Sequence, residues 1–194
     1  LPVYWGNRNW HPLLADTLAR MKADGVRRAL AFVTSAYSSY SACRQYLDDI
    51  VRARAVVGTG APEVDKLRAF YDHPGFIGPM IERVQAALDQ VPGAALLFTA
   101  HSIPQAMAAN CRYEEQLREA SRLVADGVGR PNWNLVYQSR SGPPPQPCLE
   151  PDVADCSPAR HQKSPPSAAV VVPLGISSDP CDVTVYSAPR AAHP

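Results

Sequence analysis

The sequence predicts an α/β protein built on parallel strands, and two observations lead to this fold class. Apolar runs of strand length alternate along the chain with segments whose apolar residues recur at helical spacing. The run AALLFTA at residues 94–100 is apolar throughout, as expected of a strand that is covered on both faces. No internal repeat is visible. Together these features indicate repeated β–α units, in which helices connect parallel strands.

Each expected element follows from local chemistry. A helix begins near Pro12, because proline is favoured in the first turn, and Gly25 ends it. Leu117, Ala120 and Val124 share one face of a later helix. The expected elements are, in order, a strand at 2–5, a helix at 12–24, a strand at 26–34, a helix at 43–55, a turn at 58–62, a helix at 77–88, a strand at 94–100, a helix at 113–126, and strands at 134–138 and 168–173.

The composition excludes several classes of protein. The 194 residues include 19 basic and 18 acidic side chains, so the net charge of +1 disfavours a nucleic-acid-binding protein. A hydrophobic content of 46% suffices for a packed core, and no apolar run reaches the roughly 20 residues that span a bilayer. The five cysteines are scattered and odd in number, which disfavours a disulfide framework. We therefore expect a cytoplasmic protein without a transmembrane segment.

Proline divides the chain into two parts. Residues 1–142 hold 8 of the 20 prolines, and residues 143–194 hold the other 12. Because each proline fixes φ and removes a backbone donor, the second part is not expected to be mostly regular helix or sheet. Residues 168–173, AAVVVP, are its one candidate strand. The chain also opens at Leu1 directly on an apolar run, so we expect that residues are missing before it.

Chemistry is expected where the parallel strands end, because ligands of open α/β sheets bind beyond the carboxyl ends of the strands. Polar and ring-bearing residues follow four of the expected strands, at residues 6–12, 34–41, 101–104 and 138–142. No glycine-rich phosphate loop and no GxSxG, HExxH or CxxC motif occurs. Their absence disfavours nucleotide-binding enzymes, the common hydrolases and locally closed zinc or iron–sulfur sites.

His101 is the most informative single residue, because it ends the strongest expected strand and is followed by Ser-Ile-Pro. An imidazole titrates near pH ~6.5, so a histidine here can accept a proton or bind a divalent metal at neutral pH. The alternative is a structural histidine that caps the strand by hydrogen bonding to the backbone. His11 and His73 fit a helix entrance and a turn, respectively.

Three further candidates each have a structural alternative. The loop at 35–41 can line an aromatic, hydrogen-bonding pocket or serve as a polar connector. Arg8 and Arg140 can bind carboxylates as planar forks or lie solvated at the surface. Cys43, at the N-terminus of an expected helix, can ligate a metal or be a small buried residue.

Five segments resemble, in their order and spacing, the ferrochelatase family, specifically the actinobacterial type that makes coproheme. They are WGNRNWHP, FVTSAYSSYSACRQY, VDKLRAFYDHPGF, LLFTAHSIP and YQSRSGPP followed by LEPDV. The resemblance implies a chelatase-like fold of Rossmann-like parallel sheets flanked by helices, with two lobes around a porphyrin cleft and the first lobe incomplete. It assigns residues 1–153 to the end of the first lobe and the start of the second. Residues 154–194 are then a divergent, proline-rich tail.

The resemblance also implies an activity, the insertion of ferrous iron into coproporphyrin III, which is a lyase reaction late in heme synthesis. His101 matches the family's catalytic histidine, which contacts the metal and takes protons from the pyrroles. Asp182 occupies the slot of a family glutamate, one methylene shorter, and is the expected catalytic and metal-binding partner of His101. The substrate-binding residues expected are Ser38, Tyr40, Tyr46 and Arg140.

Cys43 resembles one ligand of the [2Fe–2S] cluster of such ferrochelatases. Because one thiolate cannot hold a cluster and the family's other ligands lie beyond this chain, we expect no cluster here. Cys148 and Pro180 stand where the family has tryptophan and histidine. Two alternatives stay open, a catalytically inactive porphyrin-binding or incomplete fragment and, less favoured by the WGNRNWHP and YQSRSGPP motifs, a sirohydrochlorin-type chelatase. The expected partners are coproporphyrin III and ferrous iron, without nucleic acid, and we expect a monomer.

Overall fold

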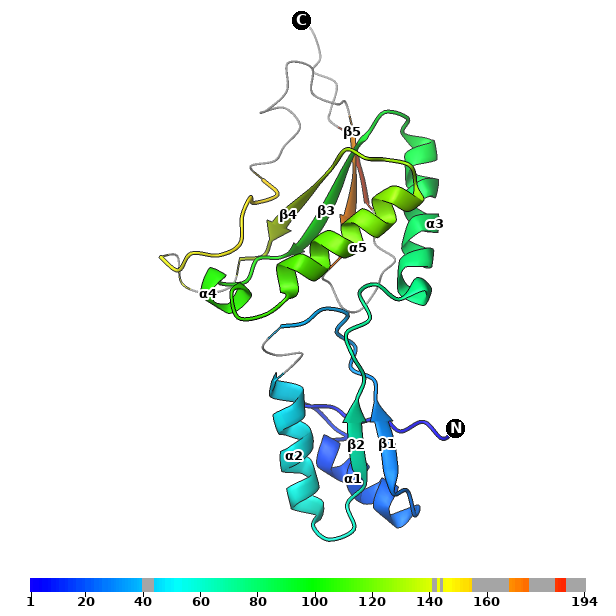
Figure 1. Cartoon of the computed structure of the whole chain (residues 1–194), viewed down its shortest axis with the longest axis vertical. Coiled ribbons are helices and arrows are strands. Elements are labelled where there is room, and N and C mark those ends of the chain that lie inside the picture. Colours follow the sequence, from blue (N-terminus) through cyan, green and yellow to red (C-terminus); the bar gives the residue numbers. More distant parts are fainter. Residues whose placement is uncertain (40–43, 141–142, 144, 155–167, 175–183, 188–194) are drawn as a thin grey trace, which may run out of the picture. The chain divides into compact units, whose positions relative to one another are not determined.

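The chain is divided into two compact units (Figure 1). A computed structural model describes residues 1–39, 44–140, 143, 145–154, 168–174 and 184–187, the last four by their backbone alone. Unit 1 comprises residues 1–35 and 39–69, and unit 2 comprises residues 36–38 and 70–194. No helix in the described ranges combines the length and the apolar character that crossing a membrane requires.

In its described residues, unit 1 consists of two helices and a two-stranded parallel sheet. Its elements are α1 (Leu14–Ala23), β1 (Arg28–Ala31), α2 (Tyr46–Val57) and β2 (Glu63–Lys66). Burial alternates along both strands, and Ala29 and Val64 lie on the more buried face. They pack against Leu18, Met21 and Ala53, the buried residues of a small core formed with the two helices.

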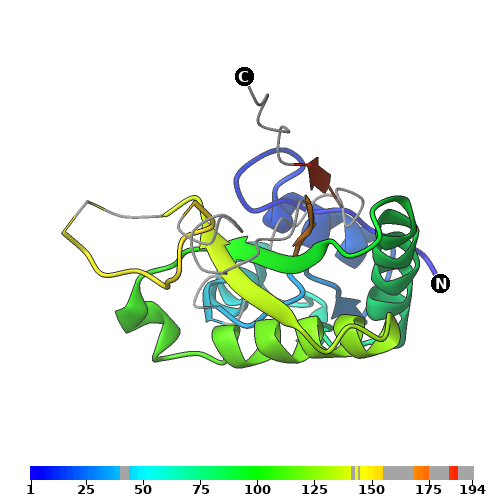
Figure 2. The ribbon, with the colours of Figure 1, turned by 90° about the horizontal axis from the view of Figure 1, so that it is seen from above.

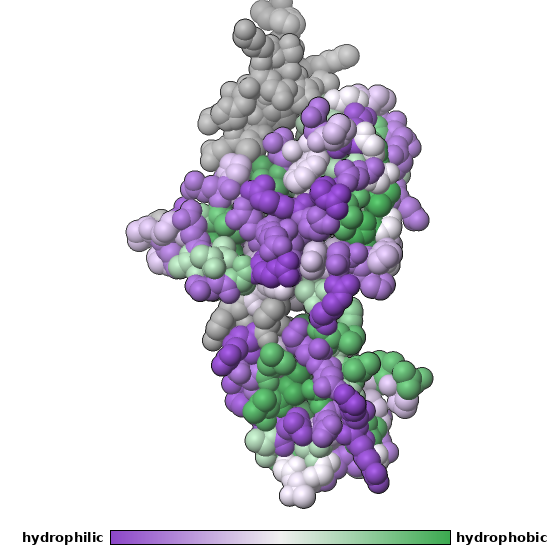
Figure 3. Space-filling view, viewed as in Figure 1, coloured by the Kyte–Doolittle hydropathy of each residue, from purple (hydrophilic) through white to green (hydrophobic). Residues whose placement is uncertain are grey.

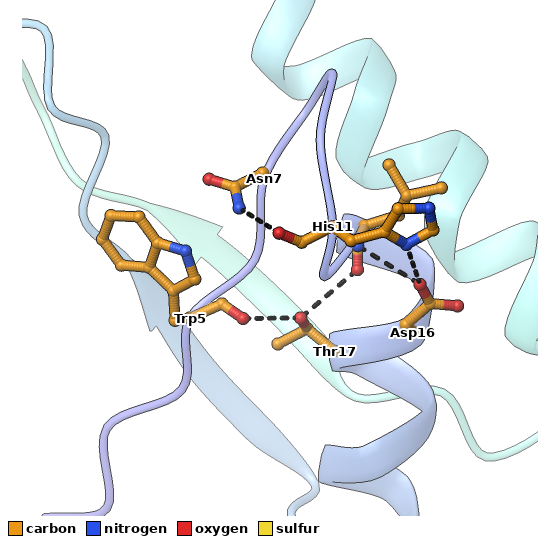
Figure 4. A network of polar contacts seen from close by, with 6 residues as sticks. Trp5, Asn7, His11, Asp16 and Thr17 are labelled. Carbon is orange, nitrogen blue, oxygen red and sulfur yellow. Dashed lines mark hydrogen bonds and ion pairs between the residues drawn. The ribbon is translucent and has the colours of Figure 1, made fainter.

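Polar contacts fix the chain before α1 (Figure 4). The Thr17 hydroxyl donates a hydrogen bond to the main-chain carbonyl of Trp5 at 2.7 Å. The Asp16 carboxylate accepts from the Leu13 N–H at 3.2 Å and lies 3.9 Å from a ring nitrogen of His11. Asp16 therefore caps the first turn of α1, and His11 belongs to the helix entrance, as the sequence predicts.

The strand expected at residues 2–5 is wrong. These residues are not in a strand, and Val3 and Trp5 remain 94% and 67% exposed. A strand exists only where a neighbour takes its backbone hydrogen bonds, and no described strand pairs with this segment. The strand expected at 26–34 is shorter, at 28–31, and its partner β2 went unpredicted because its sequence, EVDK, contains a single apolar residue.

Unit 1 also leaves apolar side chains exposed. Leu30 of β1 is 67% exposed, and Val51 and Val56 of α2 lie largely in solvent as well. Figure 3 shows apolar surface gathered over α2. The core of unit 1 is therefore small in comparison with the apolar surface that unit 1 presents.

The part of unit 2 that the structure describes is a four-stranded sheet with helices against one face. Its elements are α3 (Pro74–Gln90), β3 (Ala95–His101), α4 (Gln105–Ala108), α5 (Tyr113–Gly127), β4 (Trp133–Gln138), β5 (Ala168–Pro173) and β6 (Thr184–Ser187). The strand order is β4-β3-β5-β6, with the first three strands parallel and β6 antiparallel to β5. Figure 2 shows α5 running along the sheet and α3 beside it.

The core of unit 2 lies between the sheet and these helices. Val84 of α3, Phe98 of β3, Leu117 of α5 and Val170 of β5 are inaccessible to solvent. These residues come from four elements, so the apolar face of each helix and the central strands share one continuous core. The apolar patterns that predicted α3, β3, α5, β4 and β5 are confirmed, because each pattern is used in this core.

Two elements of unit 2 were not expected. Helix α4 has only four residues, too few for a periodic pattern. Strand β6 lies in the proline-rich part of the chain and is defined by its pairing with β5, with Val171 opposite Thr184. The proposed boundary between residues 153 and 154 stays a prediction, since residues 155–167 lie outside the described residues.

Candidate functional site

The carboxyl edge of the unit 2 sheet brings several predicted site segments together. Strands β3, β4 and β5 are parallel, so their last residues, His101, Gln138 and Pro173, lie along one edge. His101 is directly opposite Gln138. Because β6 is antiparallel, its first residue, Thr184, lies at this same edge.

His101 is held by its backbone while its ring remains available. The strand before it is buried on both faces, and His101 itself is half-buried. Its main-chain carbonyl accepts a hydrogen bond from the Tyr113 hydroxyl at 3.3 Å. The His101 ring has no hydrogen-bond partner among the described residues. This arrangement disfavours the structural alternative, in which the ring would cap the strand.

The turn after His101 is fixed by a second segment of chain, residues 147–153, which we call the strap. The buried Ser102 hydroxyl donates to the main-chain carbonyl of Leu149 at 2.8 Å, and the Ser102 N–H donates to that of Gln138 at 2.8 Å. The Leu149 N–H in turn donates to the carbonyl of Ile103 at 2.9 Å. The backbone that follows the catalytic candidate is thus tied both to β4 and to the strap.

The strap continues along the outer edge of β4. The Tyr137 N–H donates to the carbonyl of Pro151 at 2.9 Å, and the Val153 N–H donates to the carbonyl of Tyr137 at 2.8 Å. The strap therefore connects the ends of β3 and β4. This contact gives a structural role to the LEPDV segment, whose first residue is Leu149.

Helix α5 connects the end of β3 to the loop segment at residues 36–38. The Ser38 N–H donates to Gln116 Oε1 at 2.7 Å, and Gln116 Nε2 donates to the Ser38 hydroxyl at 2.9 Å. Gln116 is buried, at 4% exposure. Beside it, the ring of Tyr37 contacts those of Tyr113 and Phe76 edge-on, with centroids 6.1 and 6.3 Å apart. Ser38 is therefore anchored in unit 2 through one turn of α5.

The buried tyrosines Tyr37 and Tyr113 stay protonated at neutral pH. Burial raises the pKa of Tyr113 to about 12, and burial also raises the pKa of Tyr37 far above its ordinary value. A protonated phenol is a hydrogen-bond donor. Tyr113 therefore keeps its donor to the His101 carbonyl throughout the neutral range.

Arg140 follows β4 at the same edge of the sheet. Ser139, between them, has a positive φ of 54°, which is uncommon for a residue with a Cβ. The exposed Arg140 guanidinium donates through Nη2 to the main-chain carbonyl of Gln146. Arg140 thus belongs to the same edge as His101.

Tyr46 belongs to unit 1, at the first turn of α2. The Arg8 guanidinium lies 5.8 Å from the centroid of the Tyr46 ring, and Arg8 Nε is 3.0 Å from an Asp49 oxygen. Arg8 is therefore paired within unit 1 rather than solvated alone. His73 caps α3 by accepting the Gly75 N–H on Nδ1 at 3.0 Å, which confirms its predicted turn role.

The structure thus groups His101, Ser38 and Arg140 in unit 2 and leaves Tyr46 in unit 1. Tyr40, Cys43 and Asp182 lie outside the described residues. In the described part of the chain, no three His, Cys, Asp or Glu side chains form a metal-binding group.

Gln116 and Tyr113 were not identified as site residues from the sequence, although the sequence contains an indication for Gln116. Gln116 interrupts the apolar face of α5 that Leu117, Ala120 and Val124 define. A polar residue on a buried helix face must find a hydrogen-bond partner. Such an interruption therefore indicates a specific contact, even though the sequence does not name the partner.

Comparison with known proteins gives one consistent result. The family model described as Ferrochelatase matches residues 1–189. A ferrochelatase of Rhodopirellula baltica is 54% identical over 187 residues, which cover 94% of this chain and 53% of the relative. Coproporphyrin III ferrochelatases of Mycobacteroides abscessus and Frankia alni are 48% and 50% identical, covering 94% and 99% of this chain and 55% of each relative. The chain spans about half the length of the curated relatives it matches.

Proposed function

The chain belongs to the ferrochelatase family, and on this premise we propose that it carries part of the machinery that inserts ferrous iron into coproporphyrin III, a lyase reaction of heme synthesis. Relatives named coproporphyrin III ferrochelatase support this porphyrin as the substrate. Iron is a substrate of the reaction rather than a resident cofactor.

One observation carries the proposal: His101 is half-buried at the end of a buried strand that is paired on both sides, and its ring lacks a hydrogen-bond partner among the described residues. Metal insertion requires that the pyrrole N–H protons leave the macrocycle as iron sheds its water. A neutral imidazole held near the macrocycle can accept such a proton. The hydrogen bonds to the His101 carbonyl and to Ser102 hold the backbone of this base in place.

Asp182 is the proposed acidic partner of His101. In the sequence it stands two residues before Thr184, which opens β6 at the edge where β3 ends. A carboxylate suits ferrous iron and can pass on the protons that the imidazole takes. We propose that Ser38, Tyr40, Tyr46 and Arg140 contact the porphyrin, with Arg140 suited to its propionate carboxylates because a guanidinium binds carboxylates as a planar fork.

The test is anaerobic mixing of the purified 194-residue chain with coproporphyrin III and ferrous iron, followed by visible absorption. Metal insertion replaces the free-base bands by those of the metalloporphyrin. We expect His101→Ala to abolish insertion, because it removes the proton acceptor. His11→Ala, at an exposed histidine of the α1 entrance, is the matched control and should retain it. Full turnover by His101→Ala would refute the assignment.

A second candidate function is porphyrin binding without metal insertion. The observation that favours it is the shorter carboxylate at Asp182, in the position where the family has a glutamate. In that case the porphyrin bands shift without the change of pattern that metallation causes. Asp182→Glu should then raise insertion if the reach of the carboxylate is limiting, and an unchanged rate excludes that explanation.

We also propose that the protein works in the cytoplasm. The sequence has five scattered cysteines, an odd number that disfavours the disulfide framework of an exported protein. Fractionation of cells that produce the protein, followed by immunodetection, tests this location.

A further inference from the structure

Gln116 does more than fill a place in the core of unit 2. Both ends of its side-chain amide are used by one residue, Ser38, which lies 78 positions away in the sequence. The neighbouring positions Leu117 and Ala120 are apolar and fully buried. Packing alone would be served by an apolar side chain, so the amide is explained by its two hydrogen bonds.

The direction of these hydrogen bonds is determined by chemistry. The Ser38 backbone N–H can only donate, so the Gln116 atom 2.7 Å from it must be the amide oxygen. The Gln116 amide nitrogen is then the donor to the Ser38 hydroxyl oxygen, at 2.9 Å. The Ser38 hydroxyl therefore acts as an acceptor toward Gln116.

A hydroxyl that accepts one hydrogen bond still has its own proton to donate. The Ser38 proton has no acceptor among the described residues, and Ser38 is only half-buried. The contact of Tyr37 with Tyr113 fixes the preceding residue, so the Ser38 backbone is held in place while the hydroxyl proton can still rotate about the Cβ–O bond. The anchored segment thus presents a hydrogen-bond donor on the side away from Gln116.

We infer that Gln116 is a positioning residue that holds Ser38 and orients its hydroxyl as a donor to an anionic oxygen of the substrate, such as a porphyrin carboxylate. This inference rests on the proposed function for the identity of the ligand. It does not depend on metal insertion, since binding alone requires the donor. Gln116 acts only through Ser38.

Two substitutions of Gln116 distinguish its two proposed roles, holding the Ser38 backbone and orienting the Ser38 hydroxyl. In Gln116→Glu the ionised carboxylate accepts from the Ser38 N–H and also from the Ser38 hydroxyl, which keeps the anchor but turns the proton inward. In Gln116→Met both hydrogen bonds are lost at similar volume. Gln85→Met is the matched control, at an exposed glutamine of α3 whose one hydrogen-bond partner among the described residues is Asp89.

The experiment uses the whole chain and two readouts, hydrogen exchange of the Ser38 amide and titration with coproporphyrin III followed by absorbance without metal. We expect Gln116→Met to raise the exchange rate of Ser38 and Gln116→Glu to leave it slow. Both variants, and Ser38→Ala, should weaken porphyrin binding by roughly tenfold, the loss typical of one charge-assisted hydrogen bond. Gln85→Met should match the unsubstituted chain in both readouts.

The outcomes distinguish the inference from the function on which it rests. Unchanged Ser38 exchange in Gln116→Met overturns the anchor, and unchanged porphyrin affinity in Gln116→Glu overturns the orientation of the hydroxyl. If Gln116→Met does not fold, Gln116→Glu and Ser38→Ala still decide the second point. If the unsubstituted chain binds no coproporphyrin III, the proposed function and the ligand part of the inference both fail. The exchange rates of the Ser38 amide still test whether Gln116 holds Ser38.

Discussion

Units 1 and 2 are both built from alternating strands and helices, but they differ in how completely they bury their apolar side chains. In unit 2, helices α3 and α5 and the central strands share one core in which Val84, Phe98 and Leu117 are inaccessible to solvent. In unit 1, the fully buried cluster is much smaller, and Leu30 and Val51 remain in solvent. The comparison shows that amphipathic sequence patterns form helices and strands in both units. How deeply the apolar side chains are buried depends instead on how many helices and strands pack around them.

The largest expected effect tests the core of unit 2. Leu117→Ala should lower the free energy of unfolding of unit 2 by about 2 to 5 kcal/mol, because it leaves a cavity at a fully buried position. Leu47→Ala, at a half-exposed leucine of α2, should cost far less. Urea unfolding followed by the fluorescence of Trp133, in a background with Trp5 and Trp10 replaced by Phe, measures the loss in unit 2, and hydrogen exchange of the α2 amides at increasing urea measures the loss in unit 1. Equal losses would remove the difference between the units.

Alkaline pH should weaken unit 2 through its buried tyrosines. The pKa of Tyr113 is raised from 10.0 to about 12, so the folded chain holds this proton more tightly than the unfolded chain. The resulting stabilisation is complete below pH 10 and is lost as the pH rises through about 12, with an upper size near ~3 kcal/mol. Tyr113→Phe lacks the titrating group.

Urea unfolding at increasing pH measures this effect. Between about pH 9 and 12, the free energy of unfolding of Tyr113→Phe should fall less steeply than that of the unsubstituted chain. Parallel pH dependences in the two proteins would contradict the burial of this phenol. At neutral pH the variant also reports the smaller loss of the hydrogen bond to the His101 carbonyl.

Hydrogen exchange should directly compare how strongly the two sheets protect their backbone amides. Amides of β3, which is paired on both sides, should exchange at least about tenfold more slowly than amides of β1, which has one partner among the described strands and a smaller core. Mass spectrometry of peptides from the two strands gives both rates in one experiment. Faster exchange in β3 than in β1 would reverse the comparison.

The smallest effect is expected from the ion pair on the outer face of unit 1. Arg28 Nε lies 2.7 Å from an Asp65 oxygen, but both side chains are at least half exposed. Water and salt screen such pairs, so Arg28→Gln should leave the urea midpoint nearly unchanged at physiological salt. A clear fall in the midpoint would show that this pair contributes to the stability of the small sheet.

The same comparison explains how far the sequence predicts the fold. Helices α3 and α5 and strand β3 are predictable because their burial is recorded in the spacing of their own apolar residues. The expected strand at 2–5 and the unexpected β6 depend instead on whether another strand pairs with them. Local sequence carries little information about that pairing.

The site divides in a similar way. The placement of His101 at a strand end is predictable, since the apolar run before it ends abruptly at a polar residue. The contact between Gln116 and Ser38 is not, because the two residues meet only through the packing of α5 beside the loop segment. The signal in the sequence is limited to an amide on an otherwise apolar helix face.

The strap has a further consequence, for the behaviour of the protein at high concentration. An outermost strand offers free backbone groups to a strand of another molecule, which is a common route to aggregation. At Tyr137 both main-chain groups are already engaged, by Pro151 and Val153. A foreign strand therefore finds no donor or acceptor at that point of β4 and cannot extend along its last residues. The segment that steadies the backbone after His101 thus also protects this part of the sheet against growth into fibres.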